Sequence, residues 1–299
     1  MSEQQTILIT GASGLLGANL ARHYAQKSKC FGWYGSNPVD IAGVIPQRID
    51  ITDQESVLAA IAQIQPDIII HCAAATNVEW CEKNPALAKK INEDASEFLA
   101  KTSSNIDAKF VYTSSDSVFD GKTGNYSESD QPSPLNSYAA GKVRSEELVA
   151  ASNPDAMIIR SYFYGHSPSG SRSLLEWVLV RAQVGNEVPG FTDSYFSPIS
   201  VHDFATAIDA AIDSDHSGLL HLGSSERMSK YEFARLVMEA HDCDMSLLKP
   251  ITVNDAGLKA DRPRDTSLNV DLQASILATK ILSVAEGIER ISLEPNPFQ

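Results

Sequence analysis

The stretch from Thr6 to Gly17 constrains the fold of this chain more than any other part of the sequence. Residues 6–10, TILIT, are short, apolar and rich in β-branched side chains, as in a buried parallel strand. They run directly into the glycine-rich segment GASGLLG, after which apolar residues recur at helical spacing to about residue 26. A strand, a glycine turn and a helix in immediate succession predict the first β-α step of an open parallel sheet.

The three glycines of this turn have separate predicted roles. Gly11 would make the tight turn, Gly14 would let the backbone approach a pyrophosphate, and Gly17 would let the helix pack closely on the strand. The spacing is GxxGxxG rather than GxGxxG, and an ordinary strand-to-helix turn is the alternative. The context favours a dinucleotide site, whose predicted contacts here are Gly11, Ser13, Gly14, Leu15, Leu16 and Gly17.

The end of the second predicted strand, residues 29–34, bears on the choice of dinucleotide. NAD sites usually place an acidic residue there to hold the ribose 2′-hydroxyl. This chain has Tyr34, Gly35, Ser36 and Asn37, and Asp40 lies beyond a proline. No carboxylate would repel a 2′-phosphate, although no arginine is adjacent in the sequence. We therefore predict NADP(H) rather than NAD(H), with contacts from Tyr34, Ser36 and Asn37.

Further β-α steps follow along the chain. A short strand around residues 47–49 leads to Asp50 and Ile51, predicted at the adenine, and then to a helix over 54–64. An ordinary turn carboxylate is an equal alternative for Asp50. The strand 67–71 ends in His71, predicted to be a packed histidine, and in small residues that would let a cofactor lie against the backbone. The predicted contacts from these later strand ends are Ala73, Ala74, Ala75 and Thr113.

The alternation of strands and helices persists through a fifth strand at 109–113 and a sixth at 156–160. It predicts an α/β fold with a Rossmann-type doubly wound parallel sheet over residues 1–160. The remainder, 161–299, is less regular. It predicts a smaller mixed α/β substrate-binding region, with segments returning to the first domain. We expect helices at 174–183 and from about residues 202 and 230, a glycine- and proline-rich stretch at 185–198, and a short strand at 219–221.

Composition excludes several classes of function. The net charge of −14, without a basic stripe, argues against nucleic-acid binding. No apolar run approaches the roughly 20 residues of a membrane span, and no signal-type segment follows Met1, so we predict a cytoplasmic protein without a membrane partner. The four cysteines lack metal-ligand spacing, which predicts reduced thiols and no metal site.

Tyr138 and Lys142 are four residues apart on a predicted helix that Asn136 or Ser137 would cap. Side chains at this spacing share one face of a helix. Lowering a tyrosine pKa from about 10 to about 7 requires roughly 4 kcal/mol, which an adjacent cation can supply. The pair is therefore a candidate for proton transfer. An ordinary amphipathic helix is the alternative if the spacing is taken alone.

The glycine turn, Ser115, Tyr138 and Lys142 occur in the order found in the extended short-chain dehydrogenase/reductase superfamily, which this chain resembles. More narrowly, SSDSVFDG at 114–121, YSESD at 126–130 and PLNSY at 134–138 resemble the dTDP-4-dehydrorhamnose reductase family. The segment 67–76 and the dipeptide Arg262-Pro263 also match motifs of that family. The resemblance extends over roughly the whole chain and is sharpest over residues 110–145.

The resemblance implies hydride transfer from NADP(H) to the C4 ketone of a nucleotide-linked deoxysugar. Tyr138 would be the general acid, Ser115 would bind the same oxygen, and Lys142 would hold the nicotinamide ribose. Asn92 matches the family's helix asparagine, which can position a water in a proton relay; a helix-surface asparagine is the alternative. The implied substrate contacts are Thr76, Val78, Ser115, Asp116, Tyr138, Tyr162, Phe163 and Phe196.

The chain departs from the family pattern on the substrate side. Ser117 replaces a tyrosine, and the segments 161–165 and 191–199 follow the family only loosely. The reaction class is therefore better indicated than the sugar, the nucleotide or the product stereochemistry.

Two alternative functions stay open. One is a sugar-nucleotide epimerase or dehydratase of the same superfamily. The other is a non-enzymatic NADP-binding regulatory subunit, because a close relative of this family binds methionine adenosyltransferase and modulates it. A homodimer is a further possibility.

Overall fold

The computed structural model describes residues 4–257, 260–277 and 281–298. Contacts between residues divide the chain into two units. The first contains the described residues up to Ser114, together with Asn136–Ile159 and His216–Leu220. The second contains Ser115–Leu135, Arg160–Asp215 and the described residues from His221 onward. Each unit is therefore assembled from segments that are distant in the sequence.

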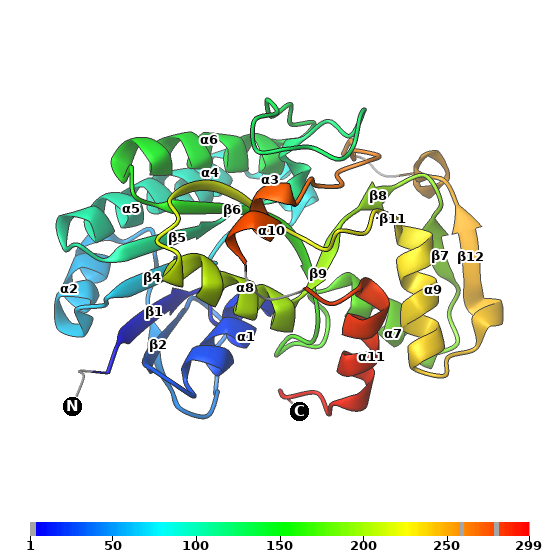
Figure 1. The fold of residues 1–299 in the computed structure, drawn as a ribbon, viewed down its shortest axis with the longest axis horizontal. Coiled ribbons are helices and arrows are strands. Elements are labelled where there is room, and N and C mark those ends of the chain that lie inside the picture. The colour runs from blue at the N-terminus through cyan, green and yellow to red at the C-terminus, as the bar shows by residue number, and fades with distance from the viewer. Residues whose placement is uncertain (1–3, 258–259, 278–280, 299) are drawn as a thin grey trace. The chain divides into compact units, whose positions relative to one another are not determined.

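The first unit is built on a parallel sheet (Figure 1). The order of the strands is β10-β6-β5-β4-β1-β2-β3, and the pairings from β3 to β6 are parallel. The strands are β1 (Thr6–Thr10), β2 (Lys29–Tyr34), β3 (Val44–Arg48), β4 (Ile68–His71), β5 (Lys109–Thr113), β6 (Met157–Tyr164) and β10 (Gly218–Leu222). The order 3-2-1-4-5-6 confirms the predicted Rossmann-type fold, in which ligands bind at the carboxyl ends of the strands where the order reverses.

Helices cover this sheet on both faces. Helices α2 (Gln54–Ile64), α5 (Ala95–Asn105) and α6 (Ser137–Ser152) contribute to one hydrophobic core, whose buried residues include Trp33 and Phe110. Figure 1 shows α1 (Leu15–Tyr24) on the face opposite α5 and α6. The central strands are almost wholly apolar and buried, as expected where both faces of a parallel sheet are covered.

The connection between β4 and β5 consists of several consecutive helical segments. It contains α3 (Val78–Lys83), α4 (Pro85–Lys89), a π-helical turn (Lys90–Asp94) and α5. The resemblance implied a helical position for Asn92. The π turn between α4 and α5 contains Asn92 and places it inside, with 2% of its surface exposed. The helix-surface alternative for Asn92 is therefore wrong.

The second unit combines short strands and helices. Its helices are α7 (Leu174–Gln183), α8 (Val201–Asp213), α9 (Lys230–Ala240), α10 (Asp271–Ile276) and α11 (Val284–Leu293). Strand β7 (Val188–Phe191) pairs with β12 (Leu248–Ile251), β8 (Tyr195–Phe196) with β11 (Met228–Ser229), and β9 (Pro198–Ser200) with the end of β6. The predicted helices near 174, 202 and 230 and the strand near 219 are confirmed. The stretch 185–198 holds strands that the sequence did not predict.

The described part of the chain contains no helix that is both long and apolar enough to cross a membrane. The four cysteines are all free, and Cys30 and Cys81 are buried.

Candidate active site

The glycine turn has the geometry that its sequence predicted. Gly11 has φ +69°, and a Cβ there would lie 2.7 Å from the backbone nitrogen of Ala73. A Cβ at Gly17 would lie 2.2 Å from the carbonyl oxygen of Gly11, so only glycine lets α1 sit this close to the turn. A Cβ at Gly14 would meet only the Gly11 oxygen, at 3.2 Å. Gly14 thus presents a nearly bare backbone at the start of α1.

The start of α1 fits an anionic ligand. Gly14 is the N-cap of this helix, and no side chain caps it. The first N–H groups of a helix have no partner within the helix, and the helix dipole places positive potential there. Ser13 is half-buried beside this end, whereas Leu15 and Leu16 turn into the core and offer only backbone atoms. These residues fit the pyrophosphate of a dinucleotide.

The segment after β4 is held close to the glycine turn. The Thr10 hydroxyl accepts a hydrogen bond from Ala73 N at 3.1 Å. The Asn92 amide binds both backbone atoms of Ala75, accepting from its nitrogen at 2.8 Å and donating to its oxygen at 3.0 Å. Both polar atoms of the Asn92 side chain are thus committed to holding this segment. Ala73, Ala74 and Ala75 are half-buried, Thr76 beyond them is exposed, and Val78 is buried at the start of α3.

The predicted adenosine-side residues lie at the ends of β2 and β3. Tyr34 is half-buried, whereas Ser36 and Asn37 are exposed. The Oδ1 atom of Asp50 accepts from the nitrogen and hydroxyl of Thr52, at 2.9 and 2.8 Å, which closes the turn before α2. Ile51, beside it, packs against the core.

An arginine that the sequence did not suggest lies at the same edge. Arg48 on β3 lies opposite Tyr34 on β2 in the pairing of the two strands, and Arg48 is exposed. A 2′-phosphate bound at the end of β2 would therefore have a cation on the neighbouring strand. Arg48 and Tyr34 are distant in the sequence, so only the strand register connects them. The proximity of β2 and β3 was predictable, but the register was not.

Helix α6 begins where the sequence predicted and is capped twice. The side chain of Asn136 accepts from Ala139 N at 3.0 Å. The Glu82 carboxylate, on α3, accepts from the nitrogen and the hydroxyl of Ser137, at 2.7 and 2.8 Å. These hydrogen bonds lower the pKa of Glu82. The residue immediately before Tyr138 is therefore fixed by a carboxylate that the sequence did not identify.

Tyr138 is half-buried, whereas Lys142, one turn later, is only 3% exposed. The Lys142 ammonium donates to the carbonyl oxygen of Thr113 at 2.8 Å and to the phenol oxygen of Tyr112 at 3.2 Å, so it is bound to the end of β5. Burial lowers the pKa of Lys142, whereas the neighbouring Tyr138 and Glu146 raise it. A buried ammonium beside a tyrosine is suited to stabilising a phenolate.

A second contact joins β5 to α6. The Ser114 hydroxyl donates to the Glu146 carboxylate at 2.5 Å, and both residues are buried. The Thr113 hydroxyl donates to the carbonyl oxygen of His71 at 2.9 Å. The strand end that precedes Ser115 is therefore fixed from the helix and from β4.

Ser115 itself begins the second unit's polar turn. Its hydroxyl lies 2.8 Å from that of Ser117 and 3.3 Å from the Asp116 carboxylate, to which it donates. Asp116 is buried and accepts from the Thr266 hydroxyl at 2.5 Å. Burial raises the pKa of Asp116. The Ser115 hydroxyl is thus hydrogen-bonded within its own turn, and Ser117, where the family has tyrosine, is one of its partners.

Two of the predicted substrate aromatics come together around a lysine. The rings of Tyr162 and Phe196 pack edge to face with centroids 4.8 Å apart. The Lys230 ammonium lies 4.6 Å from the Tyr162 centroid and 4.8 Å from that of Phe196. Phe163 packs elsewhere, against Phe204 of α8. Lys230 was not singled out in the sequence, because its position depends on the strands at 185–198.

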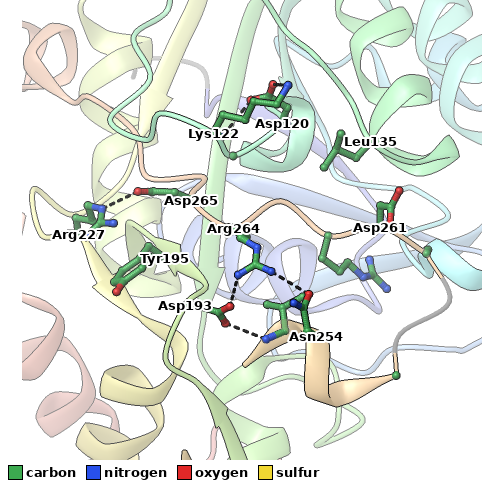
Figure 2. Close-up of a pocket in the computed structure, with 15 residues that line it drawn as sticks. Asp120, Lys122, Leu135, Asp193, Tyr195, Arg227, Asn254, Asp261, Arg264 and Asp265 are labelled. Carbon is green, nitrogen blue, oxygen red and sulfur yellow. Dashed lines mark hydrogen bonds and ion pairs between the residues drawn. The ribbon is translucent and has the colours of Figure 1, made fainter. Parts of the chain in front are cut away.

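A pocket of about 910 Å³ also lies in the second unit (Figure 2). Arg264 pairs there with Asp193 and donates to Asn254 at 2.9 Å. Arg227 lies 2.7 Å from the Asp265 carboxylate and 3.7 Å from the centroid of Tyr195. The charged residues that line the pocket are Lys122, Arg227, Arg262, Arg264, Asp120, Asp193, Asp261 and Asp265. Among the described residues that line the pocket, acidic and basic side chains are equal in number, so their formal charges cancel.

Known proteins resemble this chain over nearly its whole length. It is 34% identical over 269 residues to a probable low-salt glycan biosynthesis reductase of Haloferax volcanii, covering 88% of this chain and 89% of the relative. It is 32% identical over 272 residues to methionine adenosyltransferase 2 subunit beta of Bos taurus, covering 88% and 80%. The crystal structure of a dTDP-4-dehydrorhamnose reductase from Bacillus anthracis in complex with NADP superposes with a TM-score of 0.86, at 27% identity, covering 97% of this chain and 99% of that one.

The model of the RmlD substrate binding domain matches residues 5–294. This match includes the glycine turn, the β5 end and the Tyr138 helix. The chain therefore belongs to the RmlD substrate binding domain family.

Proposed function

We propose that this protein is an NADP(H)-dependent reductase of a nucleotide-linked 4-keto-6-deoxysugar. The observation that carries the proposal is the Tyr138–Lys142 pair, in which a buried ammonium is bound to the end of β5 and adjoins a half-buried phenol. A cofactor-binding protein without catalysis has no need of such a pair. The glycine turn, whose helix end has no capping side chain, supports the dinucleotide part of the proposal.

Reduction of the ketone requires one hydride and one proton. The bound cofactor would supply the hydride to the carbonyl carbon and leave in its oxidised form. Tyr138 would transfer its phenolic proton to the carbonyl oxygen, which becomes the hydroxyl of the product alcohol. Ser115 would donate a hydrogen bond to that oxygen, and Lys142 would stabilise the resulting phenolate and hold the ribose. A proton from solvent then restores Tyr138.

We further propose that NADP(H) is preferred over NAD(H) because Arg48 binds the 2′-phosphate. Arg48 is exposed and in register with Tyr34 at a strand end that lacks a carboxylate. Arg48→Gln should raise the KM for NADPH about tenfold and leave that for NADH within about twofold, because one charged hydrogen bond to a phosphate is lost. Arg22→Gln, on the last turn of α1, is the matched control. Equal effects on both cofactors would contradict the assignment.

The reductase proposal is tested by incubating the protein with NADPH and a panel of nucleotide-linked 4-keto-6-deoxysugars. We expect oxidation of one NADPH for each alcohol formed. Turnover without net consumption of NADPH would identify an epimerase instead, since an epimerase returns the hydride to the sugar. Absence of turnover across the panel would count against both enzymes.

The second candidate function is a regulatory subunit that binds NADP. It is favoured by the 32% identity to methionine adenosyltransferase 2 subunit beta over 88% of this chain. Purification of the tagged protein from its native cells would test it. Co-purification of a methionine adenosyltransferase in fixed stoichiometry, together with no turnover on the sugar panel, would favour this role over the reductase.

A further inference from the structure

Tyr112 gives Lys142 a hydrogen-bond partner that the proposed proton transfer does not account for. Tyr112 lies on β5 with 1% of its surface exposed. Its phenol oxygen accepts from the Lys142 ammonium at 3.2 Å, and the ammonium lies 4.7 Å from the centre of the Tyr112 ring. With the Thr113 carbonyl at 2.8 Å, Lys142 thus has two acceptors on consecutive residues of one strand.

Two serines lie near the Tyr112 hydroxyl. They are Ser96 on α5 and Ser145 on α6. Ser96 donates its own proton to the carbonyl oxygen of Asn92 at 2.5 Å, and Ser145 lies 2.7 Å from both that oxygen and the Gly141 carbonyl. Each serine has one proton, and each directs it to a backbone carbonyl. Neither serine proton is therefore directed at the phenol oxygen, which accepts from the Lys142 ammonium.

His71 completes the same network in its neutral form. Its Nε2 lies 3.0 Å from the Ser96 hydroxyl and its Nδ1 lies 2.7 Å from that of Thr10. Because Ser96 donates to Asn92, Nε2 carries the proton and Nδ1 accepts from Thr10. Burial lowers the pKa of His71 to about 3, so the ring remains neutral. The His71 and Ser96 side chains are thus committed to hydrogen bonds with groups other than the phenol oxygen of Tyr112.

Other titratable groups also face Lys142 or Tyr112. They are Tyr138 and Glu146 on α6, His71 and Cys72 at the end of β4, and Glu93 in the π-helical turn. Burial raises the pKa of Cys72 to about 12, so this thiol stays neutral, as does His71. The acceptors of Tyr112 and Thr113, with the charge of Glu146, therefore oppose the loss of the Lys142 proton that burial favours.

We propose that Tyr112 is a positioning residue whose phenol oxygen holds the Lys142 ammonium charged and fixed at the end of β5. The consequence for turnover rests on the proposed reductase function. The effect on Lys142 does not, and can be measured without substrate or cofactor.

The direct test is an NMR titration of lysine ¹³Cε in protein labelled at lysine, with the Lys142 signal assigned by its loss in Lys142→Arg. The background carries Tyr138→Phe, so that Lys142 does not titrate together with a phenol. Adding Tyr112→Phe removes the acceptor and keeps the ring, and should lower the Lys142 pKa by about one unit, a tenfold weaker proton affinity. An unchanged Lys142 pKa would overturn the proposal.

The matched control is Tyr164→Phe in the same background. Tyr164 is also a buried tyrosine, and its hydroxyl donates to the Val284 carbonyl at 3.2 Å in the second unit. It should leave the Lys142 titration unchanged; an equal shift in this control would reduce the effect to general destabilisation and also overturn the proposal. Even if the protein reduces none of the sugars in the panel, these titrations still test whether Tyr112 holds the Lys142 ammonium.

Discussion

At the scale of single residues, the proposed chemistry depends most on the phenolic proton of Tyr138. Tyr138→Phe should lower kcat by at least about 10²-fold, the usual contribution of a positioned general acid, and leave the Kd for NADPH within about twofold. Stopped-flow turnover and fluorescence titration would measure these effects. Lys142→Met is the informative comparison, because it should weaken NADPH binding as well as turnover. Wild-type turnover in Tyr138→Phe would refute the assignment of the acid.

Glu82 provides a pH-dependent prediction at the start of the Tyr138 helix. Its folded-state pKa is lowered by two hydrogen bonds from Ser137, so its contribution to stability is present above the unfolded glutamate pKa of about 4.3 and is lost as the pH falls through the folded-state value. Glu82→Gln should therefore lower the Tm at pH 7, and the difference from wild type should shrink as the pH falls below about 4.3 and vanish below the folded-state pKa of Glu82. Glu289→Gln, at another exposed helix position, should show no such difference. A gap in Tm that persists in acid would contradict the role of the carboxylate.

Whether the sequence could predict a contact in the site depends on how far apart in the sequence the two contacting residues lie. Tyr138 and Lys142 share a face through helix geometry alone, and Gly11 and Gly17 meet within one turn. Arg48 instead approaches Tyr34 through strand register, and Tyr112 approaches Lys142 through the packing of α6 on β5. No local sequence pattern indicates these two long-range contacts. From the sequence alone, Arg48 and Tyr112 are only an arginine and a tyrosine in predicted strands.

At the scale of elements, two glycines of the turn have different predicted roles, Gly17 in helix packing and Gly14 in ligand binding. Gly17→Ala would place a methyl 2.2 Å from the Gly11 oxygen and force α1 away from the turn, which should cost about 1–3 kcal/mol in the free energy of unfolding. Gly14→Ala meets only one atom, at 3.2 Å, and should cost much less stability. Its methyl would nevertheless stand where we place the pyrophosphate.

Gly17→Ala should therefore mainly lower stability, whereas Gly14→Ala should mainly weaken NADPH binding. Urea unfolding should rank Gly17→Ala as the less stable, whereas NADPH titration should show a loss of affinity in Gly14→Ala that its stability does not explain. If Gly14→Ala binds NADPH as tightly as wild type, the pyrophosphate does not lie against this residue.

Elements were predictable where they are long or buried on both faces. The apolar strands and helix α2 stand out in the sequence, and α2 occupies the predicted residues 54–64. The strands β7, β8 and β9 have only two to four residues each and include Pro189, Gly190 and Pro198. Prolines and glycines usually indicate loops, and here long-range pairing with β12, β11 and β6 overrides that local preference.

At the scale of the whole molecule, neither unit is a continuous piece of chain. Strand β10, from residues 218–222, lies beside β6, and Gly218 N donates to the Ala156 oxygen at 2.8 Å. In the other direction, segment 115–135 belongs to the second unit, where Phe119 and Tyr126 stack with centroids 4.1 Å apart and Tyr126 N donates to the Ser267 oxygen at 2.9 Å. A break at residue 160 would therefore remove partners from both units.

A fragment of residues 1–160 should consequently not fold as an independent dinucleotide-binding domain. It would lose β10 from the sheet edge and expose Val118 and Phe119, each fully buried in the intact chain and each worth about 1.5–3 kcal/mol of burial. We expect broad, non-cooperative urea unfolding and binding of a hydrophobic dye, with no measurable NADPH affinity. A fragment that lacks residues 115–135 and has β10 joined after β6 by a short linker is the matched comparison and should recover part of the cooperativity. Cooperative unfolding with NADPH binding in the simple 1–160 fragment would show that the segments of the first unit outside it are dispensable.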